Sequence, residues 1–197
     1  MATHFYAQLP MPKGVEQGVL RGMYLLHIGG RSPVRATLLG SGTILREALA
    51  AAQILESEFG VPADVFSVTS FSELRREALA IERSAMLNPG AKAVLSYVRE
   101  CLGGRDGPFI AATDYMKIVA DQIRQWVPGR YVTLGTDGFG RSDSRAALRG
   151  FFEVDRHWIV VAALKALADD GKVDMASVAT AMKKFGIDPS KPNPLVC

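Results

Sequence analysis

Apolar residues in the first half of the chain follow two different spacings. Three short runs rich in β-branched or apolar residues predict strands, at residues 23–28, 34–39 and 63–69. Between the second and third runs, apolar residues recur every three or four positions from Ile44 to Phe59, which predicts a helix that ends at Gly60. Ser70 and Glu73 then have the spacing of a capping box, which predicts the start of another helix.

The second half continues this alternation and then becomes helical. Short apolar runs at 108–112 and 131–134 predict two strands, and the segment 115–126 between them has the spacing of an amphipathic helix. A helix is also expected from about Val94 to Leu102, before a GGRDG turn. After a glycine-rich loop, helical spacing returns in three stretches, at 144–152, 156–168 and 175–185.

Strands that alternate with helices are typical of a mostly parallel sheet, because each parallel crossover places a helix on a face of the sheet. We therefore predict a three-layer α/β/α domain with a mostly parallel, five-stranded mixed sheet, spanning residues 21–187. Residues 1–20 contain two prolines and no sustained periodicity, which predicts an extended arm. Residues 188–197 are expected to form a C-terminal tail in which the chain frays.

Composition and charge exclude several classes of protein. Apolar residues make up 48% of the chain and charged residues 22%, the balance of a soluble globular protein. Its 23 basic residues exceed its 20 acidic residues but are dispersed, so we expect no nucleic-acid partner. The longest apolar run has seven residues, so no membrane span is expected. Cys101 and Cys197 lack metal-ligand neighbours, and Cys101 in an apolar stretch suits a reduced core residue and a cytoplasmic location.

The sequence Gly40-Ser41-Gly42 follows a predicted strand and precedes a predicted helix, which is the geometry that presents backbone N–H groups to a phosphate. A dinucleotide fingerprint would need a third glycine, but Leu45 stands at that position, and no carboxylate ends the next strand. A tight turn with Ser41 as a helix cap explains the same residues and is the favoured interpretation.

The densest polar cluster is the loop Gly135–Ser144, which follows a predicted strand at the place where α/β sheets bind ligands. Its candidate contact residues are Thr136, Asp137, Gly138, Phe139, Gly140, Arg141, Ser142 and Asp143. In a functional interpretation Arg141 holds an anion, and the two aspartates pair with a cation or with an arginine of a partner. Alternatively, the glycines make turns, Asp143 or Ser144 caps the next helix, and Arg141 forms an internal ion pair with one aspartate.

The stretch Trp158–Leu164 is apolar over two helical turns. Such a helix is either buried on every side or meets another subunit. Trp158, Val160 and Val161 are therefore candidate interface residues, although burial within one domain explains the pattern as well. None of the three histidines has a serine or cysteine in a nucleophile-elbow context, so no catalytic triad is expected.

Several longer motifs resemble one family, the C-terminal domain of the homodimeric bacterial pyruvate dehydrogenase E1 component. They are LLGSGTILREAL, SVTSFSELRREA, ERSAMLNP, ATDYMK and above all LGTDGFGRSDSRAALRGFFEVD. The resemblance covers the chain from about Gly14 to its end. It implies a transketolase C-terminal-like fold within a thiamine diphosphate enzyme that decarboxylates pyruvate and reductively acetylates a lipoyl group on the E2 acyltransferase.

The resemblance also implies where the chemistry takes place. In the family, a Gly-Asp-Gly motif with a downstream Asn in another domain holds the diphosphate and Mg²⁺, and a Glu in the middle domain activates the cofactor. The segment Gly135–Gly138 only mimics that motif, so no catalytic, cofactor-binding or metal-binding residue is expected in this chain. Its expected partners are the other domains of the E1 chain, the dimer mate and, through the parent complex, E2. The alternative is a small anion- or nucleotide-binding module that uses the Gly40–Gly42 and Gly135–Ser144 loops.

Overall fold

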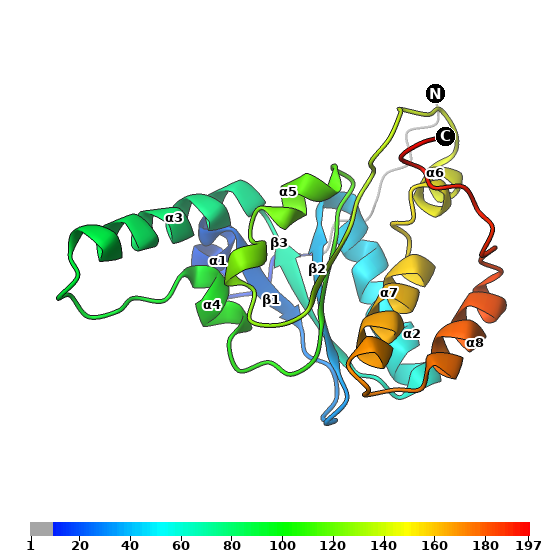
Figure 1. Cartoon of the computed structure of the whole chain (residues 1–197), viewed down its shortest axis with the longest axis horizontal. Coiled ribbons are helices and arrows are strands. Elements are labelled where there is room, and N and C mark those ends of the chain that lie inside the picture. The colour runs from blue at the N-terminus through cyan, green and yellow to red at the C-terminus, as the bar shows by residue number, and fades with distance from the viewer. Residues whose placement is uncertain (1–9) are drawn as a thin grey trace.

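The computed structural model describes residues 10–197, and its centre is a twisted five-stranded sheet (Figure 1). The strands are β1 (Met23–His27), β2 (Ala36–Ser41), β3 (Ala63–Val68), β4 (Phe109–Ala112) and β5 (Tyr131–Leu134). They lie in the order β1-β3-β2-β4-β5, and β1 alone runs antiparallel to its neighbour. The predicted mixed, mostly parallel sheet is confirmed.

Helices cover both faces of this sheet. The α-helices are α1 (Glu16–Arg21), α2 (Leu45–Phe59), α3 (Phe71–Leu87), α4 (Tyr97–Leu102), α5 (Lys117–Asp121), α6 (Arg145–Phe151), α7 (Arg156–Asp169) and α8 (Met175–Phe185). Two short 3₁₀ turns, η1 (Gly42–Ile44) and η2 (Arg124–Trp126), complete the elements. In Figure 1, α2, α7 and α8 lie on one side of the sheet, and α1, α3, α4 and α5 lie on the other.

The alternation of side chains along each strand divides the core into two clusters. Leu38 of β2 and Ile110 of β4 face α2 and α7, whereas the next residues, Leu39 and Ala111, face the cluster under α3, α4 and α5. Each of these four residues is fully buried. Strands buried on both faces explain why their sequences are continuous apolar runs rather than alternating ones.

Three details differ from the sequence-based expectations. Part of the expected extended arm is helical, because α1 occupies residues 16–21; residues 1–9 of that arm lie outside the described part of the chain. The expected helix at 115–126 is only α5 followed by η2, although Ile123 and Trp126 are buried. The expected helix from Val94 begins at Tyr97.

Two glycines, Gly18 and Gly22, explain how α1 packs and where it ends. Gly18 lies so close to β1 that a Cβ on it would stand 2.8 Å from the Cβ of Tyr24. Gly22 ends the helix in the left-handed conformation, with φ 107°, and its carbonyl accepts hydrogen bonds from the N–H groups of Thr69 and Ser70. Gly18 therefore lets this short helix pack closely against β1, and Gly22 ends it.

None of the helices in residues 10–197 is long and apolar enough to cross a membrane.

Candidate functional site

The carboxyl ends of β2, β4 and β5 surround a cavity of about 460 Å³. β2 pairs with both β3 and β4, so the chain leaves β2 toward one edge of the sheet and later returns to its other side. The strand order therefore reverses between β2 and β4, which is the point where open α/β sheets form their binding crevice. The cavity lies at this switch point.

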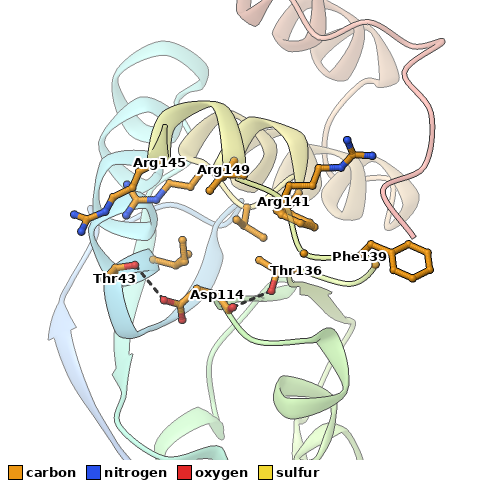
Figure 2. A pocket seen from close by; sticks show the side chains of 13 residues that line it. Thr43, Asp114, Thr136, Phe139, Arg141, Arg145 and Arg149 are labelled. Carbon is orange, nitrogen blue, oxygen red and sulfur yellow. Dashed lines mark hydrogen bonds between the residues drawn. The ribbon is translucent and has the colours of Figure 1, made fainter. Parts of the chain in front are cut away.

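Three polar side chains form the floor of the pocket (Figure 2). The Thr43 hydroxyl, from η1, donates to the Asp114 carboxylate at 3.2 Å. The Thr136 hydroxyl, after β5, donates to the backbone carbonyl of Asp114 at 2.8 Å. Asp114 comes two residues after the end of β4 and thus connects the segments that leave the other two strands.

Gly40 and Gly42, at the end of β2 and the start of η1, stand where a side chain would meet neighbouring atoms. β2 continues through Gly40 to Ser41, so the tight turn starts only at Gly42, which has φ 56°. A Cβ on Gly42 would lie 3.0 Å from an Asp114 carboxylate oxygen, and one on Gly40 would lie 2.7 Å from the Cα of Leu45. The prediction that Ser41 caps the helix is wrong, because its side chain makes no capping hydrogen bond.

Helix α6 forms the roof of the pocket (Figure 2), which is lined by Leu148 of this helix and by Phe152, the residue that follows it. Arg145 and Arg149 lie one turn apart on this helix and reach toward the end of the pocket near Thr43, whereas Arg141 lies at the opposite end (Figure 2). The three guanidinium groups thus diverge and do not converge on one point.

The buried carboxylate of Glu47, on α2, binds two arginines, Arg149 of α6 and Arg156 of α7. Arg149 donates to it at 2.9 Å, and Arg156 donates at 2.8 and 3.1 Å through its side chain and at 3.2 Å through its backbone N–H. Burial alone would raise the pKa of the Glu47 carboxyl, but the hydrogen bonds and charge of Arg156, together with the charge of Arg149, lower it below its ordinary value. Glu47 is therefore the fixed point that joins α2 to α6 and α7.

The structure brings some of the predicted loop residues to the pocket and leaves others outside it. Thr136, Gly138, Phe139, Gly140 and Arg141 line the cavity, and Asp137, Ser142 and Asp143 do not.

Asp137 and Asp143 instead accept hydrogen bonds from backbone N–H groups. Asp137 accepts a hydrogen bond from the N–H of Lys117 at 2.9 Å, at the start of α5, and Asp143 accepts from the N–H of Ser144 at 2.6 Å. Ser144 caps α6 by accepting from the N–H of Ala147, as one alternative predicted. The predicted internal ion pair of Arg141 is wrong for the described residues, because its guanidinium lies over the Phe151 ring, 4.2 Å from the centroid.

Sequence reasoning missed Asp114, Thr43, Arg145 and Glu47 as parts of this site. Asp114 comes two residues after a short apolar strand, which is a position that signals a binding crevice only once the neighbouring strands are known. Glu47 lies on an amphipathic helix, where a single carboxylate resembles any solvated residue. Neither signal could be interpreted without the strand order.

The Gly135–Gly138 segment does not fit a diphosphate-bound metal. Asp137 is the carboxylate that such a motif would use, and it is engaged with the backbone of α5. Within residues 10–197, no group of three His, Cys, Asp or Glu side chains has the geometry of a metal site.

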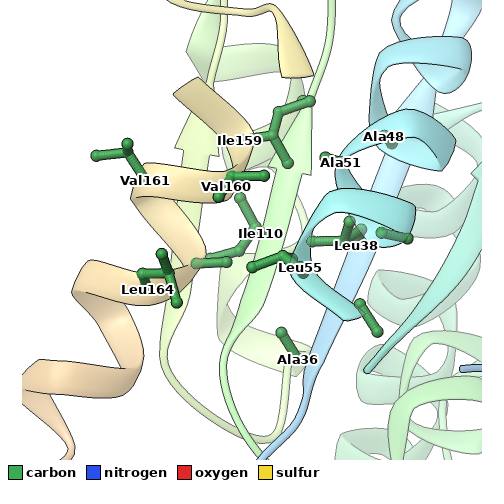
Figure 3. Close-up of a cluster of buried hydrophobic side chains, with 14 of the residues drawn as sticks. Ala36, Leu38, Ala48, Ala51, Leu55, Ile110, Ile159, Val160, Val161 and Leu164 are labelled. Atoms are coloured by element: carbon green, nitrogen blue, oxygen red, sulfur yellow. The ribbon is translucent and has the colours of Figure 1, made fainter. Parts of the chain in front are cut away.

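Helix α7 contacts α2, α8, β4 and β5, and Figure 3 shows it beside α2, with Val160 near Ile110 of β4. Val160 is fully buried and Val161 is 8% exposed, while Trp158 is half-buried. The choice of Val160 and Val161 as interface residues is therefore corrected: their side chains pack in this chain's own core. Trp158 stays a candidate contact residue.

The fold and this crevice define a class of protein. Residues 22–155 match the family described as the transketolase-like TK C-terminal domain, and the chain belongs to that family.

Relatives with curated names are more specific. The chain is 61% identical over 194 residues to the pyruvate dehydrogenase E1 component of Pseudomonas aeruginosa, with 98% of this chain and 22% of the relative covered. It is 50% identical over 192 residues to that of Cupriavidus necator, covering 96% and 22%, and 45% identical over 185 residues to that of Mycobacterium tuberculosis, covering 93% and 20%. The resemblance to pyruvate dehydrogenase E1 is confirmed, and the chain spans about one fifth of these relatives.

Solved structures support the fold alone. Transketolase from Campylobacter jejuni matches with a TM-score of 0.52 and 20% identity, over 80% of this chain and 20% of that one. Transketolase from Leishmania mexicana matches with a TM-score of 0.51 and 16% identity, over 78% and 19%.

Proposed function

We propose that this chain is the C-terminal assembly domain of a thiamine diphosphate-dependent pyruvate dehydrogenase E1 component. The parent chain decarboxylates pyruvate and reductively acetylates the lipoyl group of E2, and this domain supports packing against the other E1 domains and the dimer mate. The observation that carries the proposal is the 61% identity to a protein of that name over 98% of this chain.

The chemistry of the pocket supports an assembly role. Its lining contains arginines, threonines, an aspartate and apolar residues, and none of the lining side chains is a histidine, cysteine or lysine. Proton transfer or nucleophilic attack near neutral pH usually relies on one of those groups or on a carboxyl with a raised pKa. In this proposal thiamine diphosphate and Mg²⁺ bind to other domains of the parent chain, which is a cytoplasmic enzyme.

Exposed apolar side chains at the same end of the sheet also support it. Tyr115, Met116 and Phe139 are 61%, 58% and 77% exposed. The backbone carbonyl of Tyr115 accepts a hydrogen bond from the N–H of Thr136 at 2.9 Å, so the two loops that carry these side chains lie together. Clustered exposed aromatic residues are typical of a surface that meets another protein.

The alternative, an anion- or nucleotide-binding module, is less well supported by the geometry. The carboxylate of Asp114 lies on the pocket floor, Arg149 is already bound to Glu47, and Arg141 lies over an aromatic ring at the other end. An anion in the pocket would meet Asp114 before it met a converging set of donors.

Complementation tests the proposal. The Pseudomonas aeruginosa relative, shortened by the region that matches this chain, should release CO₂ from pyruvate slowly or not at all, and adding this chain should restore the rate. The chain alone, with thiamine diphosphate and Mg²⁺, should show no turnover above a heat-treated control. Absence of any rescue by a folded chain would contradict the assembly role.

Calorimetry distinguishes the alternative module. The assembly proposal predicts no heat when the chain is titrated with thiamine diphosphate, NAD or coenzyme A. Saturable binding of any of these three compounds, abolished by Arg145→Ala, would favour the anion-binding module instead.

A further inference from the structure

The C-terminal tail, residues 188–197, leaves α8 and runs back past the start of α7 to the loop above α6 (Figure 1). Two side-chain turns shape it. Asp188 accepts from the N–H of Ser190 at 2.8 Å, and Asn193 accepts from the N–H of Leu195 at 3.0 Å. The tail was expected to fray, but these turns give it a defined path.

Two residues of the tail face the domain while most of its other residues are exposed. Lys191 is partly buried, and Pro194 is buried. A proline with its side chain buried near the end of a chain indicates a docked segment, because termini that make no packing contacts stay exposed. Lys191 and Pro194 are therefore the two anchors of the tail.

The first anchor fixes the turn between α6 and α7. The ammonium group of Lys191 donates to the backbone carbonyl of Phe151 at 2.8 Å and to the carboxylate of Glu153 at 2.9 Å. The two charged side chains are only 22% and 27% exposed. A partly buried, charge-assisted pair that also binds a backbone carbonyl is stronger than an exposed ion pair.

Glu153 itself shows why this turn needs support. Its φ is 62°, the one positive value among the non-glycine residues of the described chain. It terminates α6, where the N–H of Val154 donates to the carbonyl of Arg149 at 3.0 Å, a position that usually carries glycine. Lys191 thus binds the side chain of the strained residue and the carbonyl of Phe151, two residues before it.

The second anchor rests on the loop that forms one wall of the pocket. The carbonyl oxygen of Pro194 lies where a side chain on Gly138 would point, 2.2 Å from the ideal Cβ position. Gly138 has φ 110°, and it lines the cavity together with Phe139 and Arg141. The tail therefore covers the outer side of the same loop whose inner side lines the cavity.

We propose that residues 188–197 are a strap that holds the 135–144 loop and the α6–α7 turn in place, so that the shape of the pocket depends on the tail. Lys191 is a positioning residue in this arrangement, and Pro194 against Gly138 is the second point of attachment. The contacts that support the strap lie within this chain, so the strap does not depend on the proposed function.

Hydrogen–deuterium exchange on the 197-residue chain tests the first anchor. In Lys191→Met, amides in 135–155 should exchange at least about tenfold faster than in the unmodified chain, while the five strands keep their protection. Lys184→Met is the matched control, since Lys184 also forms an ion pair, with Glu58 at 2.9 Å, but on the exposed face of α8. Lys191→Arg, which keeps the charge, should restore most of the protection.

A pair of glycine variants tests the second anchor. Gly138→Ala places a methyl group against Pro194 and should speed exchange in the tail and the loop. Gly171→Ala is the matched control, because Gly171 also has a positive φ, 67°, but a Cβ on it meets no atom within 4 Å, so exchange in the tail and the loop should not change. Equal exchange over 135–155 in Lys191→Met and Lys184→Met, with Gly138→Ala also unchanged, would overturn the proposal. Loss of protection in all five strands of Lys191→Met would overturn it too, because Lys191 would then support the whole fold rather than this loop.

Discussion

Glu47 makes the polar contacts that join three helices, and its chemistry gives a direct test at the scale of one residue. Its side chain is 6% exposed and accepts hydrogen bonds from Arg149 and Arg156. Removing one partner of a buried pair leaves the other charges uncompensated. Glu47→Gln should therefore lower the free energy of unfolding by roughly 2 to 3 kcal/mol, as measured by urea denaturation.

The control for this variant is Glu58→Gln. Glu58 pairs with Lys184 at 2.9 Å, but both side chains are substantially exposed, so the change should cost less than about 1 kcal/mol. Similar losses in the two variants would contradict the role assigned to Glu47.

The same carboxyl predicts a pH dependence of stability. The folded state lowers the pKa of Glu47 below the ordinary value of 4.5, so the ion pairs stabilise the fold above that pH, and the contribution is lost as the pH falls through the lower folded-state pKa. Between about pH 5 and the folded-state pKa, the unmodified chain should therefore lose more stability than Glu47→Gln does. Parallel loss in both chains across this range would show that Glu47 does not titrate as described.

At the scale of an element, α7 shows how a uniformly apolar helix is accommodated. Its residues pack against α2 and the sheet (Figure 3), and they also contact α8. Asp155 begins the helix by accepting from the N–H groups of His157 and Trp158 at 2.9 and 3.0 Å. Both α2 and α7 contact the sheet, and α8 packs on α7, so α7 is covered by neighbouring helices and strands, which a single-helix pattern cannot reveal.

Val160→Asp tests that placement. Val160 is fully buried, so an aspartate there would be an unpaired charge in the core and should unfold the domain or cost more than about 3 kcal/mol. Lys165→Ala, on the exposed side of α7 and paired with Asp169 at 2.6 Å, should change stability by less than about 1 kcal/mol. Circular dichroism reports whether Val160→Asp is folded, and sedimentation reports its association. A folded variant with altered association would contradict the core position of α7 and place the helix at the surface.

Much of the element order could be predicted from the sequence, because strand and helix spacings differ and Gly60 and Ser70 carry clear end signals. Gly60 has φ 64° at the end of α2, and Ser70 accepts from the N–H of Glu73. The two helices that were not predicted correctly are both short: α1 has six residues, too few for a periodicity to be detected, and the helical spacing at 115–126 corresponds to only five residues of α5 and the 3₁₀ turn η2. Such short helices are fixed by tertiary contacts rather than by their own sequences.

The pocket was predictable only in part, for a related reason. The loop after β5 signalled a site through its polar residues and glycines, and five of its eight candidates do line the cavity. The facing residues Thr43 and Asp114 come from segments 71 positions apart and meet only because β2 and β4 are neighbours. Sequence spacing carries no information about that neighbourhood.

At the scale of the whole molecule, the two ends of the sheet differ in character. The end where β2, β4 and β5 finish carries the pocket, the exposed apolar side chains Tyr115, Met116 and Phe139, and the strap. Near the other end of β3, the buried Asp64 holds Arg35 at 2.6 Å and also binds Arg105. That end is fixed by internal ion pairs, whereas the first presents apolar surface to its surroundings.

This asymmetry predicts how the chain associates. If the carboxyl end of the sheet meets the rest of the parent enzyme, the chain by itself exposes aromatic surface that single proteins seldom leave as a large patch. It should then self-associate in the micromolar range, in the simplest case as a two-fold dimer, because the commonest closed assembly uses the same patch on both copies. Sedimentation equilibrium measures this directly.

The variant Tyr115→Ser with Phe139→Ser should weaken that association at least tenfold without lowering the melting temperature, since both side chains are largely exposed and contribute little to the core. Leu20→Ser with Met175→Ser is the matched control, because these side chains are 70% and 48% exposed on α1 and α8, away from the pocket. Equal weakening in both double variants would mean that association follows general apolar exposure. A strictly monomeric unmodified chain would remove the carboxyl end of the sheet as the assembly surface, whatever the identity of the parent enzyme.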